Sequence, residues 1–550
     1  MQKRHRLIVS VITILGLMTV TCGLTGDDDV PRNAAVVELT ANTSLTPWLQ
    51  AAVASFNDAE VETSGGKRVY VVLNPVESGR AVAAMASGDS LPALWAPDDM
   101  VWVNLLADQG NGSFQGDCVS LAKSPLVIAM WRPVAESLGW PGRSLGWLDV
   151  GSLAADPSAW DYYSGGQFGD ALRLGHTHPG LSGTGASTLL AIVQAAESKT
   201  EAVGVEEVQQ PIVQASVSAF EAAVSWFSST TDDLGQTMSA RGIGYLGAAV
   251  MYESTVVNYG GGDPGLVPIY PFEGTFVATH PACLNSSASA EMQEAARIFR
   301  DYLLGQEAQQ MALANGLRPV NRSVSLGPPL DESRGIDLDQ PEIVFGAPSV
   351  ETVYAVQELW QSARKDVNLV MLLDTSGSMA GSKMRNVREA AIQFVEQMGD
   401  DDFITIIAFS DQPVTLVYHE QVGPARGDVI RALEDLDADG YTSLYDAIGD
   451  GAAAIADTNS SQMSNAMVVL TDGLDTNSRR YDFGQSLIEM AAAHNNTVFT
   501  IAYGSDADED LLSELALQAN GNFYLGDEAS IAAIYEEMSA AFGGSVGVGR

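Results

Sequence analysis

The sequence is poor in basic residues. Its 550 residues include 28 lysines and arginines against 69 aspartates and glutamates, which gives a formal net charge of −41. A surface with this excess of negative charge repels nucleic acid and anionic lipid headgroups, so we expect no nucleic-acid partner. The acidity suits an exterior rich in divalent cations, but it also serves solubility, and charge alone does not choose between these two roles.

Long hydrophobic runs are also scarce. The longest covers residues 7–20 and follows the basic residues 3–6. It is shorter than the roughly 20 apolar residues that a membrane-spanning helix needs. A basic segment followed by a short apolar run is typical of an export signal, which we predict over residues 1–22. Residues 23–33 are predicted to form a solvated tether.

Only three cysteines are present, namely Cys22, Cys118 and Cys283. Cys22 ends residues 18–22, which resemble a bacterial lipobox, and this resemblance implies that Cys22 becomes a lipidated N-terminus. The protein would then be anchored to the cell membrane, on its extracellular or periplasmic face. Thr19 and Thr21 depart from the usual pattern of leucine and a small residue, so a plain cleaved signal is the alternative. Cys118 and Cys283 remain as one candidate disulfide, with two buried free thiols as the alternative.

A carboxylate and two hydroxyls follow a buried apolar strand predicted at residues 367–373. Asp374, Ser376 and Ser378 occupy alternate positions, and a helix with an apolar face begins soon after. Side chains spaced in this way can converge on one cation, and an all-oxygen ligand set suits a hard divalent ion. A capped turn is the alternative, because Asp, Ser and Gly are common turn residues.

Two later stretches favour the metal site. Residues 440–448 include Thr442, and the apolar strand of residues 468–470 leads into Thr471 and Asp472. Residues 368–542 thus resemble the von Willebrand factor type A (vWA) family and its metal-ion-dependent adhesion site (MIDAS). The resemblance implies that Mg²⁺, or alternatively Mn²⁺ or Ca²⁺, is ligated by the hydroxyls of Ser376, Ser378 and Thr442. Asp374 and Asp472 would bind the ion directly or through water. Thr471 and Asp446 would be supporting residues or helix caps.

A metal ion bound in this way would keep a coordination position for an outside oxygen. Two carboxylates balance a divalent charge only formally, and hydroxyl ligands donate weakly, so the ion stays electrophilic. An acidic residue of a protein partner is the most natural donor. Hydrolysis would need a general base near the bound water, and none of the six histidines lies in the metal motifs. We therefore expect a binding protein with no catalytic residues, not an enzyme.

Residues 34–345 alternate short apolar strands with helices, a rhythm typical of parallel sheets covered by helices. We predict strands at residues 36–39, 69–73 and 126–130 and an amphipathic helix at 292–304. The region is similar to type II bacterial extracellular solute-binding proteins at residues 124–129, 176–185, 270–276 and 299–319. That resemblance implies two α/β lobes joined by crossover strands, with a small-molecule ligand in the cleft.

Four hydroxyl residues of this region, Ser44, Ser78, Ser182 and Thr184, stand at predicted helix N-termini. Exposed N–H groups and hydroxyls there can hold an oxyanion or a carboxylate. Ordinary N-capping is the simpler explanation for each residue taken alone. Glu253 is predicted to face the cleft, where its charge would disfavour an anionic ligand. The region either binds a small ligand or is a scaffold that has lost binding.

No Gly/Ser-rich linker separates the two regions. Residues 346–366 are predicted to form a connecting segment, with a helix at 350–364 that leads into the vWA domain at 367–543. Residues 544–550 would be a disordered tail. The predicted fold is α/β throughout, a two-lobed solute-binding-protein-like domain followed by a doubly wound, Rossmann-like vWA domain. The short joint predicts that the two domains pack together.

Taken together, these patterns predict an exported, lipid-anchored cell-surface protein that captures a protein partner through a metal ion. The alternative is a solute-capture lipoprotein of an importer, in which the vWA domain is an accessory. A metal-dependent hydrolase is disfavoured by the missing general base.

Overall fold

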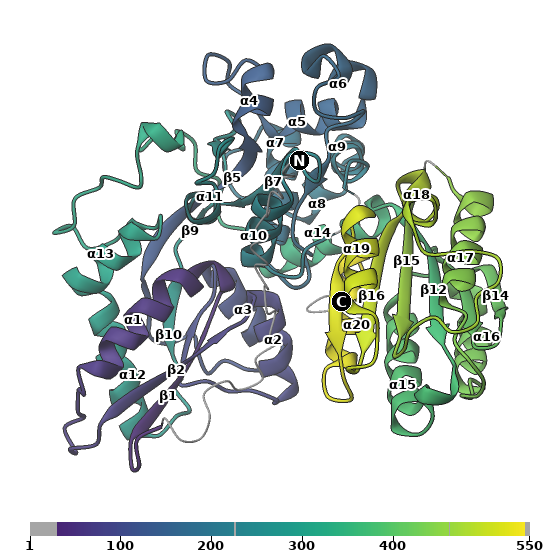
Figure 1. Ribbon diagram of the computed structural model, residues 1–550. Coiled ribbons are helices and arrows are strands. Elements are labelled where there is room, and N and C mark those ends of the chain that lie inside the picture. Colours follow the sequence, from purple (N-terminus) through teal and green to yellow (C-terminus); the bar gives the residue numbers. More distant parts are fainter. Residues whose placement is uncertain (1–29, 225–226, 461, 545–550) are drawn as a thin grey trace, which may run out of the picture.

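The described part of the chain forms three β-sheets covered by helices (Figure 1). The computed structural model describes residues 30–224, 227–460 and 462–544. Two of the sheets form the two lobes of the N-terminal region, and the third forms the C-terminal domain. The predicted export signal, Cys22, most of the tether and residues 545–550 lie outside the described residues.

Lobe 1 is built on a five-stranded sheet. β1 pairs in parallel with β2 and β3, whereas β10 is antiparallel to β3 and β4. The predicted strands at 36–39 and 69–73 and the helix at 292–304 are confirmed, with slightly shifted ends. The order is β2 (Val69–Pro75), β1 (Ala35–Ala41), β3 (Leu94–Ala96), β10 (Pro281–Leu284) and β4 (Cys118–Ser120), and the helices are α1 (Thr46–Asp58), α2 (Ser78–Ser87), α3 (Met100–Asp108), α12 (Ala290–Leu303) and α13 (Gln306–Ala314).

Lobe 2 is organised around the long strand β5 (Ala122–Trp131), which contains the strand predicted at 126–130. The chain crosses between the lobes three times, near residues 121, 280 and 317. The other strands are β6 (Leu174–Gly175), β7 (Ala248–Tyr252), β8 (Leu266–Ile269), β9 (Val277–Ala278) and β11 (Arg318–Pro319). The helices are α4 (Arg132–Ser137), α5 (Trp147–Ala155), α6 (Pro157–Ser164), α7 (Gly183–Glu197), α8 (Val205–Val208), α9 (Pro211–Glu221), α10 (Thr231–Arg241) and α11 (Glu253–Tyr259).

The C-terminal domain has a six-stranded sheet in which β14 alone is antiparallel to its neighbour. Helices cover both faces, and this explains why the central strands are apolar without alternation. The strand order is β14 (Pro413–Gln421), β13 (Phe403–Phe409), β12 (Asp366–Asp374), β15 (Met463–Thr471), β16 (Thr497–Tyr503) and β17 (Phe523–Gly526). The helices are α15 (Ser382–Gln397), α16 (Val422–Glu434), α17 (Leu444–Thr458), α18 (Gln485–Ala492), α19 (Glu509–Gln518) and α20 (Ile531–Ala541).

Alternate residues of β12 face two separate hydrophobic cores of this domain. Leu369 and Met371 pack in the core that includes α15 and α20, whereas Val370 and Leu372 pack in the core that includes α17 and α18. A strand buried in this way on both faces fixes its register firmly. Its last residue, Asp374, is therefore held at the carboxyl edge of the sheet.

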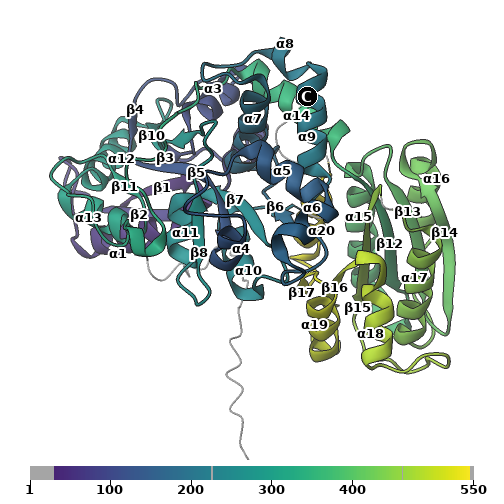
Figure 2. The ribbon, with the colours of Figure 1, turned by 90° about the horizontal axis from the view of Figure 1, so that it is seen from above.

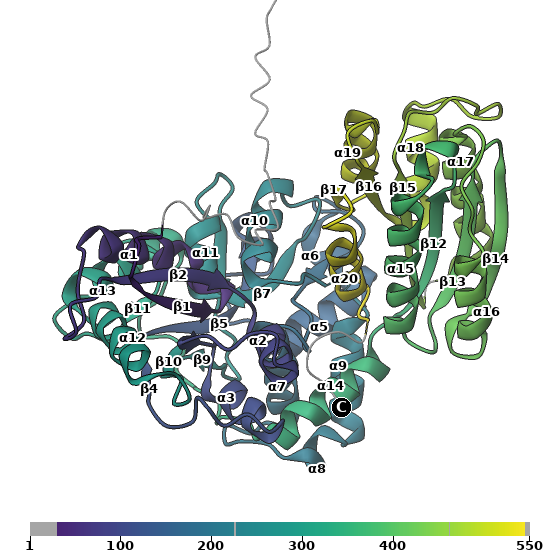
Figure 3. The same ribbon diagram turned by 90° about the horizontal axis from the view of Figure 1, so that it is seen from below.

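The two domains pack against one another through α14 (Val350–Ala363) and α20. α14 lies on α7, α8 and α9 of lobe 2 and leads within two residues into β12. In all three ribbon views, α20 lies on the side of the C-terminal domain that faces the lobes (Figures 1, 2 and 3). The backbone N–H of Phe227 donates to the carbonyl of Ala541 at 3.0 Å. The predicted packing of the domains is thus present in the structure.

A disulfide links Cys118 of β4 to Cys283 of β10, with the two Cα atoms 4.1 Å apart. These residues are direct partners in the antiparallel register of the two strands. The bond thus joins neighbouring strands of lobe 1 that are far apart in the sequence.

None of the helices within the described part of the chain is long and apolar enough to cross a membrane.

Candidate functional site

The first turn of the candidate metal site follows directly from β12. Asp374 is completely buried, and its carboxylate accepts hydrogen bonds from the backbone N–H of Ser376 at 2.8 Å and from the hydroxyl of Thr471 at 2.5 Å. Ser376 and Ser378 are linked through their hydroxyls at 3.0 Å. Burial raises the pKa of Asp374 above its usual range, an effect that hydrogen bonds from its neighbours partly offset. The turn is therefore built around a desolvated carboxylate.

Asp472 brings a second carboxylate to the same place from the end of β15. It is buried, and it accepts a hydrogen bond from the Ser378 hydroxyl at 2.7 Å. The other carboxylate oxygen lies 2.5 Å from the ammonium of Lys383, in the first turn of α15. The parallel pairing of β12 with β15 aligns the two strand ends, which explains why Asp374 and Asp472 meet.

Thr442 completes the group from a third loop. Two backbone hydrogen bonds join that loop to the turn after β12. The N–H of Gly377 donates to the carbonyl of Gly440 at 3.1 Å, and the N–H of Asp439 donates to the carbonyl of Thr375 at 2.9 Å. The Thr442 hydroxyl lies 3.9 Å from where a Cβ on Gly473 would stand, next to Asp472. The structure therefore brings all five predicted residues to one edge of the sheet.

The donor set fits a hard divalent ion. Two carboxylates and three hydroxyls supply only oxygen, which Mg²⁺, Mn²⁺ and Ca²⁺ prefer. The ammonium of Lys383 already sits against Asp472, so this spot attracts positive charge. Across residues 30–224, 227–460 and 462–544, no cluster of three or more His, Cys, Asp and Glu side chains could hold a metal ion. A site here would therefore depend on its hydroxyl ligands.

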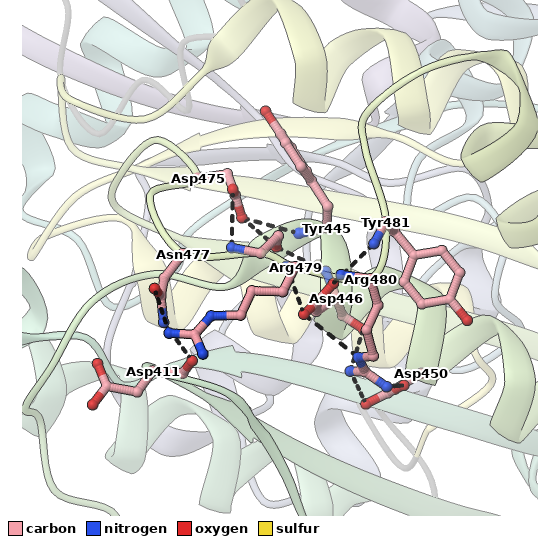
Figure 4. Close-up of polar contacts among 10 residues, drawn as sticks. Asp411, Tyr445, Asp446, Asp450, Asp475, Asn477, Arg479, Arg480 and Tyr481 are labelled. Atoms are coloured by element: carbon pink, nitrogen blue, oxygen red, sulfur yellow. Dashed lines mark hydrogen bonds and ion pairs between the residues drawn. The ribbon is translucent and has the colours of Figure 1, made fainter.

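Asp446 fixes the loop that follows Asp472 (Figure 4). Its carboxylate accepts the backbone N–H groups of Arg479, Arg480 and Tyr481 at 2.9 to 3.1 Å. Burial alone would raise the pKa of Asp446, but these three bonds and the nearby Arg480 guanidinium lower it below its usual value. Arg480 in turn pairs with Asp450 at 2.6 Å. Asp446 therefore attaches residues 479–481 to the start of α17.

The same loop is tied to Thr442. The Thr442 carbonyl accepts the N–H groups of Thr476 and Asn477 at 2.8 and 2.9 Å. The Asn477 side chain also donates to the carbonyl of Asp411 at 2.6 Å (Figure 4). These bonds connect the loop bearing Thr442 with the loop bearing Asp472 and with the turn after β13.

Exposed side chains of several kinds surround this edge. Tyr441 is 66% exposed and Leu474 is 55% exposed, although each lies within two residues of a predicted metal-binding residue. Arg479 is also exposed, and no ion pair joins it to a carboxylate in the described part of the chain. The exposed carboxylates of Asp411 and Asp439 stand on the same loops, so the rim carries apolar, basic and acidic side chains.

Sequence reasoning missed Lys383 at this site. A lysine in the first turn of a helix gives no signal of its own, since most such residues are solvated. The supporting role suggested for Thr471 and Asp446 agrees with their hydrogen bonds to Asp374 and to the loop backbone.

Four of the five predicted cleft residues lie between the lobes, but each is already bonded within the protein. Ser78 donates to Asp98 at 2.6 Å, and Ser44 donates to Asn42 at 2.6 Å. The hydroxyls of Ser182 and Thr184 lie 2.9 Å apart, and that of Thr184 lies 2.8 Å from Thr231. Their burial leaves these hydroxyls without contact to solvent.

The carboxylate of Glu77 occupies the centre of this group. It accepts hydrogen bonds from Asn42 at 3.0 Å, from the hydroxyl of Thr43, and from the backbone N–H of Thr231 at 2.7 Å. Thr231 is the first residue of α10 in lobe 2, so Glu77 joins the two lobes. A helix N-terminus that could hold an anionic solute thus already holds a carboxylate of the protein.

Direct backbone contact between the lobes closes the cleft further. The N–H groups of Gly79 and Arg80, in the first turn of α2, donate to the carbonyl of Leu181 at 2.8 and 3.2 Å. A Cβ on Gly79 would stand 2.3 Å from the carbonyl oxygen of Gly180, which no side chain can do. Glycine at position 79 therefore permits this contact.

Glu253 differs from the expectation that it faces the cleft with a free charge. It is completely buried, and Arg318 binds its carboxylate at 2.6 and 2.8 Å. The hydroxyl of Tyr270 donates to the same carboxylate. Arg318 neutralises Glu253, so this residue would not repel an anion. Local sequence pattern could not reveal this pair, because its members lie 65 positions apart.

Comparison with known proteins identifies both regions. The family model described as von Willebrand factor type A domain matches residues 368–537. The one described as bacterial extracellular solute-binding protein matches residues 37–318.

Curated relatives match only the C-terminal part of the chain. An uncharacterized protein of Synechocystis sp. is 28% identical over 159 residues, covering 29% of this chain and 37% of that protein. Inter-alpha-trypsin inhibitor heavy chain H3 of Mesocricetus auratus is 26% identical over 188 residues, covering 31% of this chain and 21% of that protein. The chain thus spans less than two fifths of the length of either relative.

Among solved structures, the periplasmic binding protein AfuA from Actinobacillus pleuropneumoniae is 14% identical, with a TM-score of 0.43. The match covers 60% of this chain and 98% of that protein.

Proposed function

Because the chain belongs to the bacterial extracellular solute-binding protein family through residues 37–318 and carries a von Willebrand factor type A domain at residues 368–537, we propose that it is an exported binding protein that captures a protein partner through a divalent metal ion. The observation that carries this proposal is the convergence of three loops at one edge of the vWA sheet. Mg²⁺, with Mn²⁺ or Ca²⁺ as alternatives, would be held there by Asp374, Ser376, Ser378, Thr442 and Asp472.

The bound ion would supply an electrophilic centre for one oxygen of the partner. A partner Asp or Glu is the best donor, because charge-assisted contacts are the strongest polar ones. The exposed rim supports this choice. Tyr441 and Leu474 would pack on apolar neighbours of that acidic residue, and Arg479 would attract a second carboxylate. The expected partner surface is therefore acidic with at least one bulky apolar side chain.

Calorimetric titration of residues 23–550 with Mg²⁺ tests the metal. We expect binding of one ion per chain, lost in Asp374→Ala because the buried carboxylate at the centre of the first turn is removed. Asp437→Ala is the matched control, since it removes an exposed carboxylate of the neighbouring loop. Unchanged binding in Asp374→Ala would refute the assignment.

The partner requirement is tested with the exported protein on cells. Crosslinks to partners should be absent when EDTA is added before the crosslinker, should reappear when Mg²⁺ is restored, and should be absent in Asp472→Ala. Capture that is indifferent to both EDTA and Asp472→Ala would favour the alternative, a solute-capture protein of an importer with an accessory vWA domain.

We also propose that the protein is anchored to the membrane through a lipid on Cys22, on the extracellular or periplasmic face. The family's description as extracellular supports export, and the pattern of residues 1–22 supports the anchor. Cys22→Ser should move the protein from the membrane fraction to the soluble exported fraction. A variant that stays with the membrane would show that the anchor is not this cysteine.

A further inference from the structure

A cavity of about 220 Å³ lies beside the closed cleft, where the two lobes meet the connecting segment. One wall comes from lobe 1, at Asp98, Asp99 and Trp102, and the opposite wall from α7 and Tyr252 of lobe 2. Residues 276–279 of the crossing strand and residues 344–348 close the remaining sides. None of Ser44, Ser78, Ser182, Thr184 and Glu253 lines it, although Asp98 in its wall accepts a hydrogen bond from Ser78.

The charges of this cavity all have one sign. Asp98 and Asp99 are its only charged lining residues, and no lysine, arginine or histidine lines it. Neither carboxylate forms an ion pair within the described part of the chain. Asp98 accepts hydrogen bonds only from the hydroxyls of Ser78, at 2.6 Å, and Tyr252, at 3.0 Å. Asp99 accepts one from Thr279 at 3.4 Å, and its carboxylate is also bonded by the backbone N–H groups of Met100 and Val101 at the start of α3.

Such carboxylates are poorly solvated and lack a counter-charge. Asp98 is 2% exposed, and burial together with the nearby Glu77 raises its pKa to about 7. Burial also raises the pKa of Asp99. A buried negative charge is costly unless it is paired, so a cation placed between the two carboxylates would stabilise both of them.

The rest of the lining suits an organic cation better than a metal ion. Trp102, Tyr252, Phe276 and Phe345 line the space, and the faces of aromatic rings attract ammonium groups. The remaining residues are mostly aliphatic, so they offer a metal ion few further ligands beyond the hydroxyls of Ser187 and Thr279. The volume is below the roughly 300 Å³ of pockets that take drug-sized ligands, so the occupant is small.

We propose that this cavity binds a small organic amine, with its ammonium group at Asp98 and Asp99 and its apolar body among the aromatic rings. The site is independent of the metal centre. The occupant touches both lobes and also Phe345 and Val353, which lead into the vWA domain. The proposed occupant is a cation, opposite in charge to the anions that the helix N-termini of the cleft would hold.

A matched series of probes tests the charge requirement. Phenethylamine, 2-phenylethanol and phenylacetate share one apolar body and carry a positive, a neutral and a negative head group, and isobutylamine offers a smaller body. Each is titrated calorimetrically into residues 23–550 in the presence of EDTA, which keeps the metal site out of the measurement. We expect at least one amine to bind, and both other head groups to bind about tenfold more weakly or not at all.

The Asp99→Asn variant tests whether the amine binds in this cavity. It should weaken amine binding by about tenfold, while Asp58→Asn, an exposed carboxylate on α1 with the same change of charge, should leave it unchanged. Thermal unfolding of each variant without probe shows whether the fold is intact. The proposal is overturned if neither amine binds, if phenylacetate binds as well as phenethylamine, or if folded Asp99→Asn binds like the parent protein.

Discussion

At the scale of single residues, Lys383 is the feature that most affects the metal proposal. Its ammonium lies against Asp472 and so occupies part of the space in which a cation would be bound. A metal ion must displace this ammonium before Asp472 can act as a ligand. The lysine then serves as a built-in competitor, which lowers the apparent metal affinity.

Lys383→Met should therefore raise the affinity for Mg²⁺ by about three- to tenfold, because the competing ion pair is removed while the aliphatic packing is kept. Calorimetric titration measures this change. Arg385→Met is the control, since it removes an exposed positive charge two residues away on the same helix. A weaker affinity in Lys383→Met would mean that the lysine organises the site instead of competing for it.

The five candidate metal residues were predictable from the sequence, whereas the state of the cleft was not. Asp374 and Asp472 each end an apolar strand, and parallel strands present their carboxyl ends at one edge of a sheet. Local pattern and topology therefore both predict that these two aspartates lie at the same edge. Glu77 and Asp98 follow no such rule. They are buried only because the lobes meet over them, and contacts between residues far apart in sequence decide that.

At the scale of elements, the loop between β15 and α18 decides how the metal edge is presented. It carries Asp472 and Leu474 at one end and Arg479 near the other, and Asp446 attaches it to α17. The sequence predicted the apolar strand of residues 468–470 that precedes it. It did not predict this attachment, because the backbone N–H groups of a loop leave no mark on residue type.

Asp446→Asn should free this loop. The substituted amide has one acceptor oxygen and brings N–H donors towards the backbone N–H groups of residues 479–481, so stability should fall by about 2 kcal/mol. Urea denaturation measures the loss, and hydrogen exchange should show faster exchange at residues 473–483. Asp450→Asn is the control, because its pairing with half-exposed Arg480 should contribute under about 1 kcal/mol. Equal losses in the two variants would show that Asp446 has no special role.

At the scale of the whole molecule, the packing of the two domains was predicted from the short joint, but its chemistry was not. Trp360 of α14 meets the rings of His178 and Phe227 at 4.6 and 5.0 Å. Arg80 of α2 pairs with Glu536 of α20 at 3.3 Å, and Arg241 of α10 donates to the carbonyl of Gly521. Apolar and charged contacts together hold the C-terminal domain and α14 against both lobes, so the lobes and the metal edge form one packed unit.

A partly buried carboxylate in this interface should make the packing depend on pH. Burial, and then the charge of Asp233 on α10, raise the pKa of Glu537 on α20 to about 7, although a hydrogen bond from Tyr524 and the charge of Arg80 oppose the shift. When the domains separate, Glu537 returns to water and to its ordinary pKa of 4.5. The packed state therefore holds more protons between these two values, and packing weakens as the pH rises through that range.

Hydrogen exchange of α20, expressed as protection relative to the unstructured chain, measures this effect. Protection should fall by about tenfold or more between about pH 5.5 and about pH 8.5, since each unit of pKa shift is a factor of ten in the equilibrium. In Glu537→Gln the side chain stays neutral, so protection should be high at both pH values. Glu536→Gln is the control, because it loses the ion pair with Arg80 and should lower protection slightly at both. A pH dependence that persists in Glu537→Gln would assign the effect to another group. If protection in the parent protein does not change with pH, the effect is excluded.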